Sequence, residues 1–180
     1  FTADGKRLMS GRPMDAGVSI YNVESGKPVA EWDARHAAWV KFNRDGTRAL
    51  DVTFGQVLSV HDAVTGGKLW DRQPFDRAIF TREGDVMAVY AGRVSLLDGM
   101  TGQEKRQVLG LNAGVSSIVA SADGSMVFLG CADGLVRCHQ MSDGEKVFEH
   151  LISSVSRPVD VALSGDGKRL VAAADLVSGA

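Results

Sequence analysis

The chain of 180 residues is poor in cysteine, proline and histidine, with two, four and four copies. Two cysteines are too few for a disulfide framework, which favours a reducing compartment, and we expect a cytoplasmic location. An excess of charge is also missing, because 20 basic and 22 acidic residues are scattered along the chain and leave a net charge of −2. Without a basic stripe or a basic amphipathic segment, neither nucleic acid nor a membrane surface is expected as a partner.

Long hydrophobic runs and the common catalytic signatures are absent as well. The longest apolar runs, such as residues 170–174, are far too short to span a bilayer. The chain begins with Phe1 instead of Met, and no signal-peptide pattern follows. It contains neither a Gly-x-x-x-x-Gly-Lys-Ser/Thr phosphate loop nor a Gly-x-Ser-x-Gly nucleophile elbow. We therefore expect no catalytic residues, no metal and no other cofactor, and a protein that is not an enzyme.

What the chain does have is a nine-residue stretch that occurs four times. Each copy alternates apolar and polar residues, continues with a bulky residue and an Asp or a side-chain amide, and ends in Gly. The alternation is typical of a half-buried strand, and the Ser/Thr/Asp-Gly ending is typical of a turn. The final glycines at positions 26, 66, 102 and 144 are separated by 40, 36 and 42 residues. The copies occupy residues 18–26, 58–66, 94–102 and 136–144.

A second marker runs out of phase with the first. It has an apolar residue four positions before a Gly and an acid directly before that Gly. The acid-Gly pair supplies the positive φ that a tight hairpin needs. Its glycines at positions 5, 46, 84, 124 and 167 are separated by 41, 38, 40 and 43 residues. The copies occupy residues 1–5, 42–46, 80–84, 120–124 and 163–167.

Four short strands, named a to d in chain order, fit each repeat. Strand a precedes the acid-Gly turn, strand b follows it, strand c opens the nine-residue stretch, and strand d is the more polar segment after that stretch. Apolar positions recur at period two and glycines fall at element ends, so helices are not expected. Four antiparallel strands repeated about every 40 residues predict an all-β fold, a β-propeller segment of four-stranded blades.

The number of strands predicts an open arc of a larger propeller. The chain holds strands b, c and d of one blade, three full blades and strands a and b of another, about four blades in all. A closed ring would not duplicate the a–b pair, so the remaining blades are expected as partners. Both ends should leave apolar faces in water and promote association; the candidates are Leu8, Ile20 and Val29, and Val161, Leu163, Leu170 and Val171. The single domain 1–180 divides into blade parts 1–32, 33–71, 72–109, 110–151 and 152–180.

These repeats resemble those of the WD-repeat β-propeller family, in which strand c ends in Trp-Asp five residues before a turn Gly. The resemblance covers nearly the whole chain, and residues 42–46 are similar to the family's Phe-Ser-Pro-Asp-Gly element. No repeat has Trp-Asp in place, and the Trp32-Asp33 and Trp70-Asp71 pairs end strand d instead, so the family's side-chain network should be absent or partial. The Trp position holds Tyr21, His61, Leu97 and His139, and the Asp position holds Asn22, Asp62, Asp98 and Gln140.

A second resemblance also implies a propeller. Residues 62–70 are similar to the quinoprotein propeller repeat Asp-x-x-Thr-Gly-x-x-x-Trp, with Trp70 in register. This resemblance leaves an alternative open, in which the chain is part of a quinoprotein-like or haem-bearing propeller oxidoreductase.

His61, His139, Asp62 and Asp98 are the candidates for chemistry inside the repeats. The two histidines replace Tyr21 and Leu97 of the sister repeats, and no other metal ligand lies at ligand spacing, so packing is the better interpretation. Asp62 and Asp98 are repeat equivalents and are expected to accept backbone N–H groups at the turn between strands c and d.

The two cysteines flank the Asp133-Gly134 turn. If Ala132 pairs with Leu135, Cys131 pairs with Val136 and Leu129 with Cys138. The cysteines then lie diagonally on one face with Cα atoms beyond the ~7 Å limit for a disulfide, so buried free thiols are expected.

Geometry assigns partner binding to one end of the blades. Strands alternate in direction, so the a–b and c–d turns share one end, which is uniform, and the b–c and d–a loops share the other, which varies between repeats. Variable loops on a rigid scaffold are where binding residues are usually carried. The sequence therefore predicts a non-catalytic scaffold for protein–protein interaction. Its candidate partner-binding residues are Arg12, Pro13, Met14, Asp15, Arg35, His36, Phe54 and Arg72.

Overall fold

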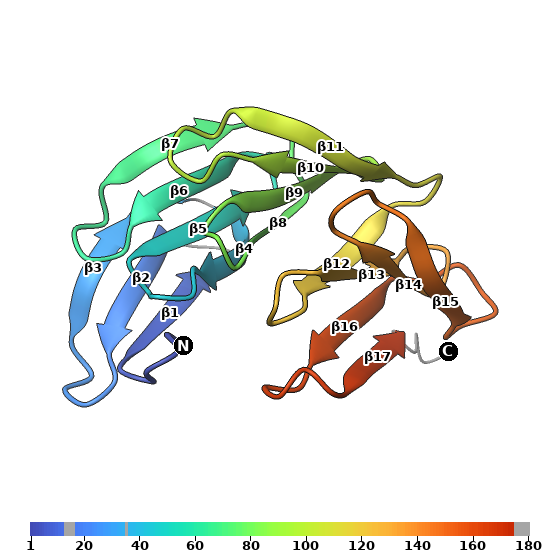
Figure 1. The fold of residues 1–180 in the computed structure, drawn as a ribbon. Helices are drawn as coiled ribbons and strands as arrows, with labels where there is room; N and C mark the ends of the chain where they lie inside the picture. The colour runs from blue at the N-terminus through green and yellow to red at the C-terminus, as the bar shows by residue number, and fades with distance from the viewer. Residues whose placement is uncertain (13–16, 35, 175–180) are drawn as a thin grey trace, which may run out of the picture. The chain divides into compact units, whose positions relative to one another are not determined.

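The structure, a computed structural model, describes residues 1–12, 17–34 and 36–174. These residues form seventeen β-strands and no helix (Figure 1). The strands are β1 (Arg7–Arg12), β2 (Gly17–Asn22), β3 (Pro28–Trp32), β4 (Ala37–Phe42), β5 (Arg48–Thr53), β6 (Leu58–Asp62), β7 (Lys68–Arg72), β8 (Arg77–Phe80), β9 (Val86–Tyr90), β10 (Arg93–Leu97), β11 (Glu104–Gly110), β12 (Val115–Ala120), β13 (Met126–Cys131), β14 (Leu135–Gln140), β15 (Lys146–Leu151), β16 (Val159–Leu163) and β17 (Leu170–Ala174).

The strands pair in chain order into five sheets. Three sheets have four strands, in the orders β4-β5-β6-β7, β8-β9-β10-β11 and β12-β13-β14-β15. The first sheet, β1-β2-β3, and the last, β16-β17, are shorter. Strands b, c and d therefore open the described chain and strands a and b end it, as the repeat pattern predicts.

The chain folds into two compact units. Unit 1 comprises Phe1–Ala88 and Leu96–Arg106, and unit 2 comprises Val89–Ser95 and Gln107–Ala180. Each unit has a core of its own, described separately below.

Unit 1 is held together by alternate residues of adjacent sheets. Leu50 and Val52 of β5 and Val60 of β6 are fully buried in one cluster with Trp70 and Val86. A second cluster joins Ile20 of β2 to Ala49 and Ala63. Side chains that alternate along a strand point to opposite faces, so β5 contributes Leu50 and Val52 to one cluster and Ala49 to the other.

In unit 2 the last hairpin packs on the sheet before it. Val159 and Val161 of β16 are buried against Val136 of β14, and Leu170 of β17 lies beside them. Side-chain hydroxyls add polar contacts: the Ser116 hydroxyl donates to the Val159 carbonyl at 2.8 Å and accepts its amide at 3.0 Å.

The β13–β14 hairpin corrects the predicted register. Gly130 pairs with Val136 and Phe128 with Cys138, one position away from the expected pairing. The reason is a three-residue loop: the Gly134 amide, at φ 85°, donates to the Cys131 carbonyl, so Leu135 does not pair with Ala132. Cys131 and Cys138 then lie on opposite faces of the sheet, and both are buried free thiols.

Two of the residues expected to be exposed at the ends of the arc are buried. Ile20 is 0% exposed because it shares a face with Ala30 and points into the core of unit 1. Val161 is 7% exposed because it points back toward Val136. The prediction is confirmed for three others: Leu8, Val29 and Val171 are 37%, 47% and 65% exposed.

Candidate interaction surface

The sequence assigned the predicted partner-binding residues to the b–c and d–a loops, and the structure describes half of them. Pro13, Met14, Asp15 and Arg35 lie outside the described residues. Arg12 is the last residue of β1 and comes directly before the b–c loop that the sequence predicts.

His36 and Phe54 are brought together by their backbones. The Phe54 amide donates to the His36 carbonyl at 3.0 Å, which ties a b–c loop to the d–a loop beside it. The Phe54 side chain is 71% exposed, and His36 is exposed with φ 63°. The two loops are hydrogen-bonded to each other and carry an exposed aromatic ring, and a protein partner could cover the apolar surface of this ring.

Further contacts tie down the same group of loops. The Phe75 amide donates to the Gln56 carbonyl at 2.8 Å, and the Gln56 side-chain amide donates to Asp76 at 2.8 Å. Phe54 is therefore presented by loops that are hydrogen-bonded to one another within unit 1.

Arg72 makes different contacts. It ends β7, and its guanidinium donates to the Thr101 carbonyl at 3.1 Å and to the Asp71 carbonyl at 2.8 Å. These bonds hold the side chain against the c–d turn of the following sheet. The structure therefore brings His36 and Phe54 together but gives Arg72 a separate environment.

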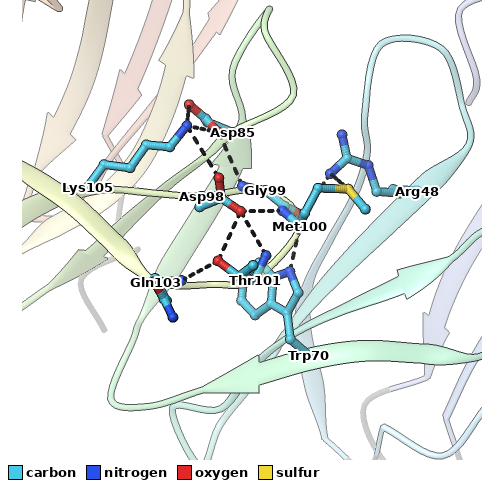
Figure 2. A network of polar contacts seen from close by, with 9 residues as sticks. All are labelled: Arg48, Trp70, Asp85, Asp98, Gly99, Met100, Thr101, Gln103 and Lys105. Carbon is cyan, nitrogen blue, oxygen red and sulfur yellow. Dashed lines mark hydrogen bonds and ion pairs between the residues drawn. The ribbon is translucent and has the colours of Figure 1, made fainter.

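The turn end of the blades is built from side-chain caps, as expected for Asp62 and Asp98. The Asp98 carboxylate accepts the amides of Met100 and Thr101 at 3.0 and 2.9 Å (Figure 2). Asp62 accepts the amides of Val64 and Thr65 in the same way, at 2.9 and 2.8 Å. These hydrogen bonds stabilise the ionised form and lower the pKa of both carboxyl groups. Both carboxylates therefore act as turn formers.

Lys105 adds an ion pair to the Asp98 turn. Its ammonium group lies 2.8 Å from both oxygens of Asp85 and 3.5 Å from Asp98 (Figure 2). The hydrogen bond to Asp85 and the nearby carboxylates raise the Lys105 pKa. The carbonyl of Gly99, in the same turn, accepts hydrogen bonds from Trp70 of β7 and Arg48 of β5 (Figure 2).

A buried polar network, not predicted from the sequence, surrounds His61. Asp51, 1% exposed on β5, accepts the Trp32 indole N–H at 2.8 Å and lies 3.2 Å from Nε2 of His61. The Trp32 ring stacks on the imidazole with 4.4 Å between centroids. The signal in the sequence was an Asp placed between the apolar residues Leu50 and Val52 of strand b. His61 therefore packs, as predicted, but in a polar network and not a purely apolar environment.

His139 is also buried, at 6% exposure, and its Nδ1 lies 2.9 Å from the Gly144 carbonyl. His61 makes the same contact with Gly66 at 3.2 Å. His61 pairs with Ala49, and Asp51 lies two residues further along the same strand. His139 pairs with Val127, and the equivalent position two residues further along is Leu129. Because leucine has no acceptor, Nε2 of His139 has no hydrogen-bond partner among the described residues. The packing interpretation holds for both histidines.

A cleft of about 280 Å³ in unit 2 is one candidate for a small-ligand site, but the charged side chains that line it pair with one another. Arg137 donates to both oxygens of Asp133, at 3.0 and 2.6 Å, which lowers the pKa of Asp133. Lys146 pairs with Glu149 at 3.1 Å. The described residues contain no cluster of His, Cys, Asp or Glu able to hold a metal ion. None of their segments forms a helix long and apolar enough to cross a membrane.

Comparison with solved structures identifies the architecture. The chain aligns with the β-propeller domain of Cps50 (Swd1) from Myceliophteria thermophila with a TM-score of 0.82 and 19% identity, over 97% of this chain and 60% of that one. The fold is that of a β-propeller. BamB from Moraxella catarrhalis aligns with a TM-score of 0.68 and 18% identity, over 93% of this chain and 56% of that one.

The propeller chain therefore spans less than two thirds of either solved structure. At the level of the fold, both resemblances noted in the sequence are confirmed. No protein-family model matches the chain, and no curated protein matches it by sequence.

Proposed function

We propose that the chain is a non-catalytic propeller segment that binds a protein partner through its b–c and d–a loops. The observation that carries this proposal is Phe54, 71% exposed beside His36 on hydrogen-bonded loops of unit 1. Hydrogen-bonded loops lose little conformational entropy when a partner binds, and an exposed aromatic ring supplies a large contact area. The cleft and the buried histidines described above have paired charges or packing roles, which supports binding over catalysis.

Site-specific photo-crosslinking tests the proposal. A benzophenone amino acid replaces Phe54 in one variant and Val64, 63% exposed on a c–d turn of the same unit, in the other. In cells, position 54 should yield a discrete crosslinked protein and position 64 should not. Phe54→Ala should weaken capture of the same protein. Crosslinking at 64 in place of 54 would contradict the proposal.

The rival oxidoreductase function makes a separate prediction. A quinone or haem held by the propeller would give a visible absorbance band in stoichiometric amount. We expect the purified protein to show only the aromatic band near 280 nm that tryptophan and tyrosine side chains give. We also propose a cytoplasmic location, because both cysteines are buried free thiols and thiols stay reduced in the cytoplasm. Fractionation of cells tests this location.

A further inference from the structure

The second residue of each a–b turn carries a polar side chain, and four of these five side chains are satisfied inside their own turns. Asn43 accepts the Arg48 amide at 2.9 Å. In three turns the second residue is a hydroxyl that donates to the Asp before the Gly at 2.6 Å and accepts the backbone amide five positions on at 2.9 or 3.0 Å. These hydroxyls belong to Thr2, Ser121 and Ser164.

Thr81 is the exception. Glu83 replaces the Asp, and the turn is one residue tighter, because the Thr81 amide donates to the carbonyl of Asp85, four positions on instead of five. The Thr81 residue is 4% exposed, and its hydroxyl has no hydrogen-bond partner among the described residues. A buried hydroxyl without a partner costs free energy, so a ligand that accepts this O–H group would remove the cost.

A second cleft, of about 350 Å³, is lined by Thr81 in unit 1, where the a–b turn at 42–46 meets the a–b turn at 80–84. Its volume lies within the range of about 300–1,000 Å³ that is typical of small-ligand sites. The two turns belong to the four-stranded sheets β4-β5-β6-β7 and β8-β9-β10-β11, so the cleft does not involve the shorter first and last sheets.

Three arginines make this cleft basic. Arg44, Arg48 and Arg82 line it together with two acids, Asp45 and Glu83, which leaves an excess of one positive charge. Arg44 and Arg82 hold the third position of their turns, and both are exposed. Arginine occupies this position only in the two turns that share the cleft. The other three turns have Ala3, Ala122 and Gly165 there.

Arg48 is held in place at the wall of the cleft. It donates to the Gly99 carbonyl at 2.7 Å (Figure 2), and its guanidinium lies 5.6 Å from the Phe80 ring centroid. The same guanidinium lies 2.6 Å from the position that a Cβ on Gly84 would take, so it reaches the second turn of the cleft. A guanidinium has five N–H donors and one carbonyl does not use them all, so donors remain for a ligand.

We propose that this cleft binds a phosphate group, either inorganic phosphate or the phosphate monoester of a modified side chain. Arg44, Arg48 and Arg82 supply charged donors from two turns, and a phosphate has enough acceptor oxygens to meet several donors at once. The Thr81 hydroxyl is covered in the structure, so it joins the site by rotating about χ1 to another staggered position. The a–b turns lie at the opposite end of the blades from Phe54, so this inference does not depend on the proposed partner-binding loops.

Isothermal titration calorimetry at constant ionic strength tests the proposal. The probes are inorganic phosphate, the N-acetyl amide of phosphoserine and, as a carboxylate control, acetate. Arg82→Ala should weaken phosphate binding about tenfold, because a charge-assisted hydrogen bond is lost. Lys68→Ala removes an exposed cation of the same unit and should have no effect. Tighter binding of the phosphoserine amide indicates a modified side chain as the source of the phosphate, and tighter binding of inorganic phosphate indicates the free ion.

Thr81→Val separates ligand binding from folding. Valine keeps the shape of the side chain and removes the hydroxyl, so phosphate affinity should fall about fivefold. Stability in chemical denaturation should be at least that of the unmodified protein, because the hydroxyl has no hydrogen bond to lose. The proposal is overturned if neither phosphate probe binds, if acetate binds as tightly, or if Arg82→Ala and Thr81→Val both leave phosphate affinity unchanged.

Discussion

At the scale of single residues, the most consequential contact is one that crosses between sheets. Asp51 accepts the Trp32 indole N–H and faces His61 in a buried site, where Asp51 and His61 are 1% and 5% exposed. A carboxylate in such a site stabilises the fold only while its partners stay in place, because a lone buried donor or charge is costly.

Asp51→Ala should therefore lower the free energy of unfolding by about 3 kcal/mol, since it leaves the Trp32 indole N–H without an acceptor and removes the contact with His61. Chemical denaturation measures the change. Asp71→Ala, which removes a solvent-exposed ion pair with Lys68, serves as the control and should cost at most about 1 kcal/mol. The Asp51→Ala/His61→Ala double variant should lose less than the sum of the single losses; strict additivity would show that the two residues are not coupled.

The turn carboxylates make stability depend on pH. Hydrogen bonds from Ser121 and Ser125 lower the pKa of Asp123 from 3.8 to about 2. Because the folded-state pKa is depressed, this contribution is fully present above pH 3.8 and is lost as the pH falls toward 2. Asp123→Ala should lower stability at neutral pH and make the loss of stability between those pH values shallower. Denaturation curves at a series of pH values check this, and an unchanged slope would contradict it.

At the scale of elements, the β13–β14 hairpin determines the chemistry of both cysteines. They lie on opposite faces of the sheet, and burial raises the pKa of each thiol. Both should resist alkylation by iodoacetamide in the native protein at neutral pH and react after denaturation. Intact mass reports the number of adducts. A native protein lighter by two protons, or one alkylated as fast as the denatured chain, would be at odds with the register.

At the scale of the whole molecule, we expect the two-stranded sheet β16-β17 to be the least stable of the described parts of unit 2. A hairpin alone is marginal in water, and β17 has no further strand on its outer edge among those described. Amides of β16 and β17 should exchange with solvent faster than those of β12 to β14. Hydrogen exchange measures this, and equal protection would mean that the hairpin is as stable as the full sheet.

The sequence by itself determined the strands, the turns and their order. Period-two alternation and turn glycines are local signals, and all the turn-forming glycines named above adopt positive φ, as the acid-Gly and Ser/Thr/Asp-Gly pairs predict. The capping roles of Asp62 and Asp98 follow from their position before a turn in the same way.

Contacts between side chains that lie far apart in the sequence were decided only by the tertiary structure. The Asp51 network, the hydrogen bonds of Arg7 to the Gly46 carbonyl and of Arg48 to the Gly99 carbonyl, and the burial of Ile20 join residues of different sheets. No local pattern specifies which side chains meet there. The hairpin at Gly134 shows the same limit at short range, because Asp-Gly suits both a two-residue and a three-residue loop. One residue of difference moves a cysteine to the other face of the sheet, since side chains alternate along a strand.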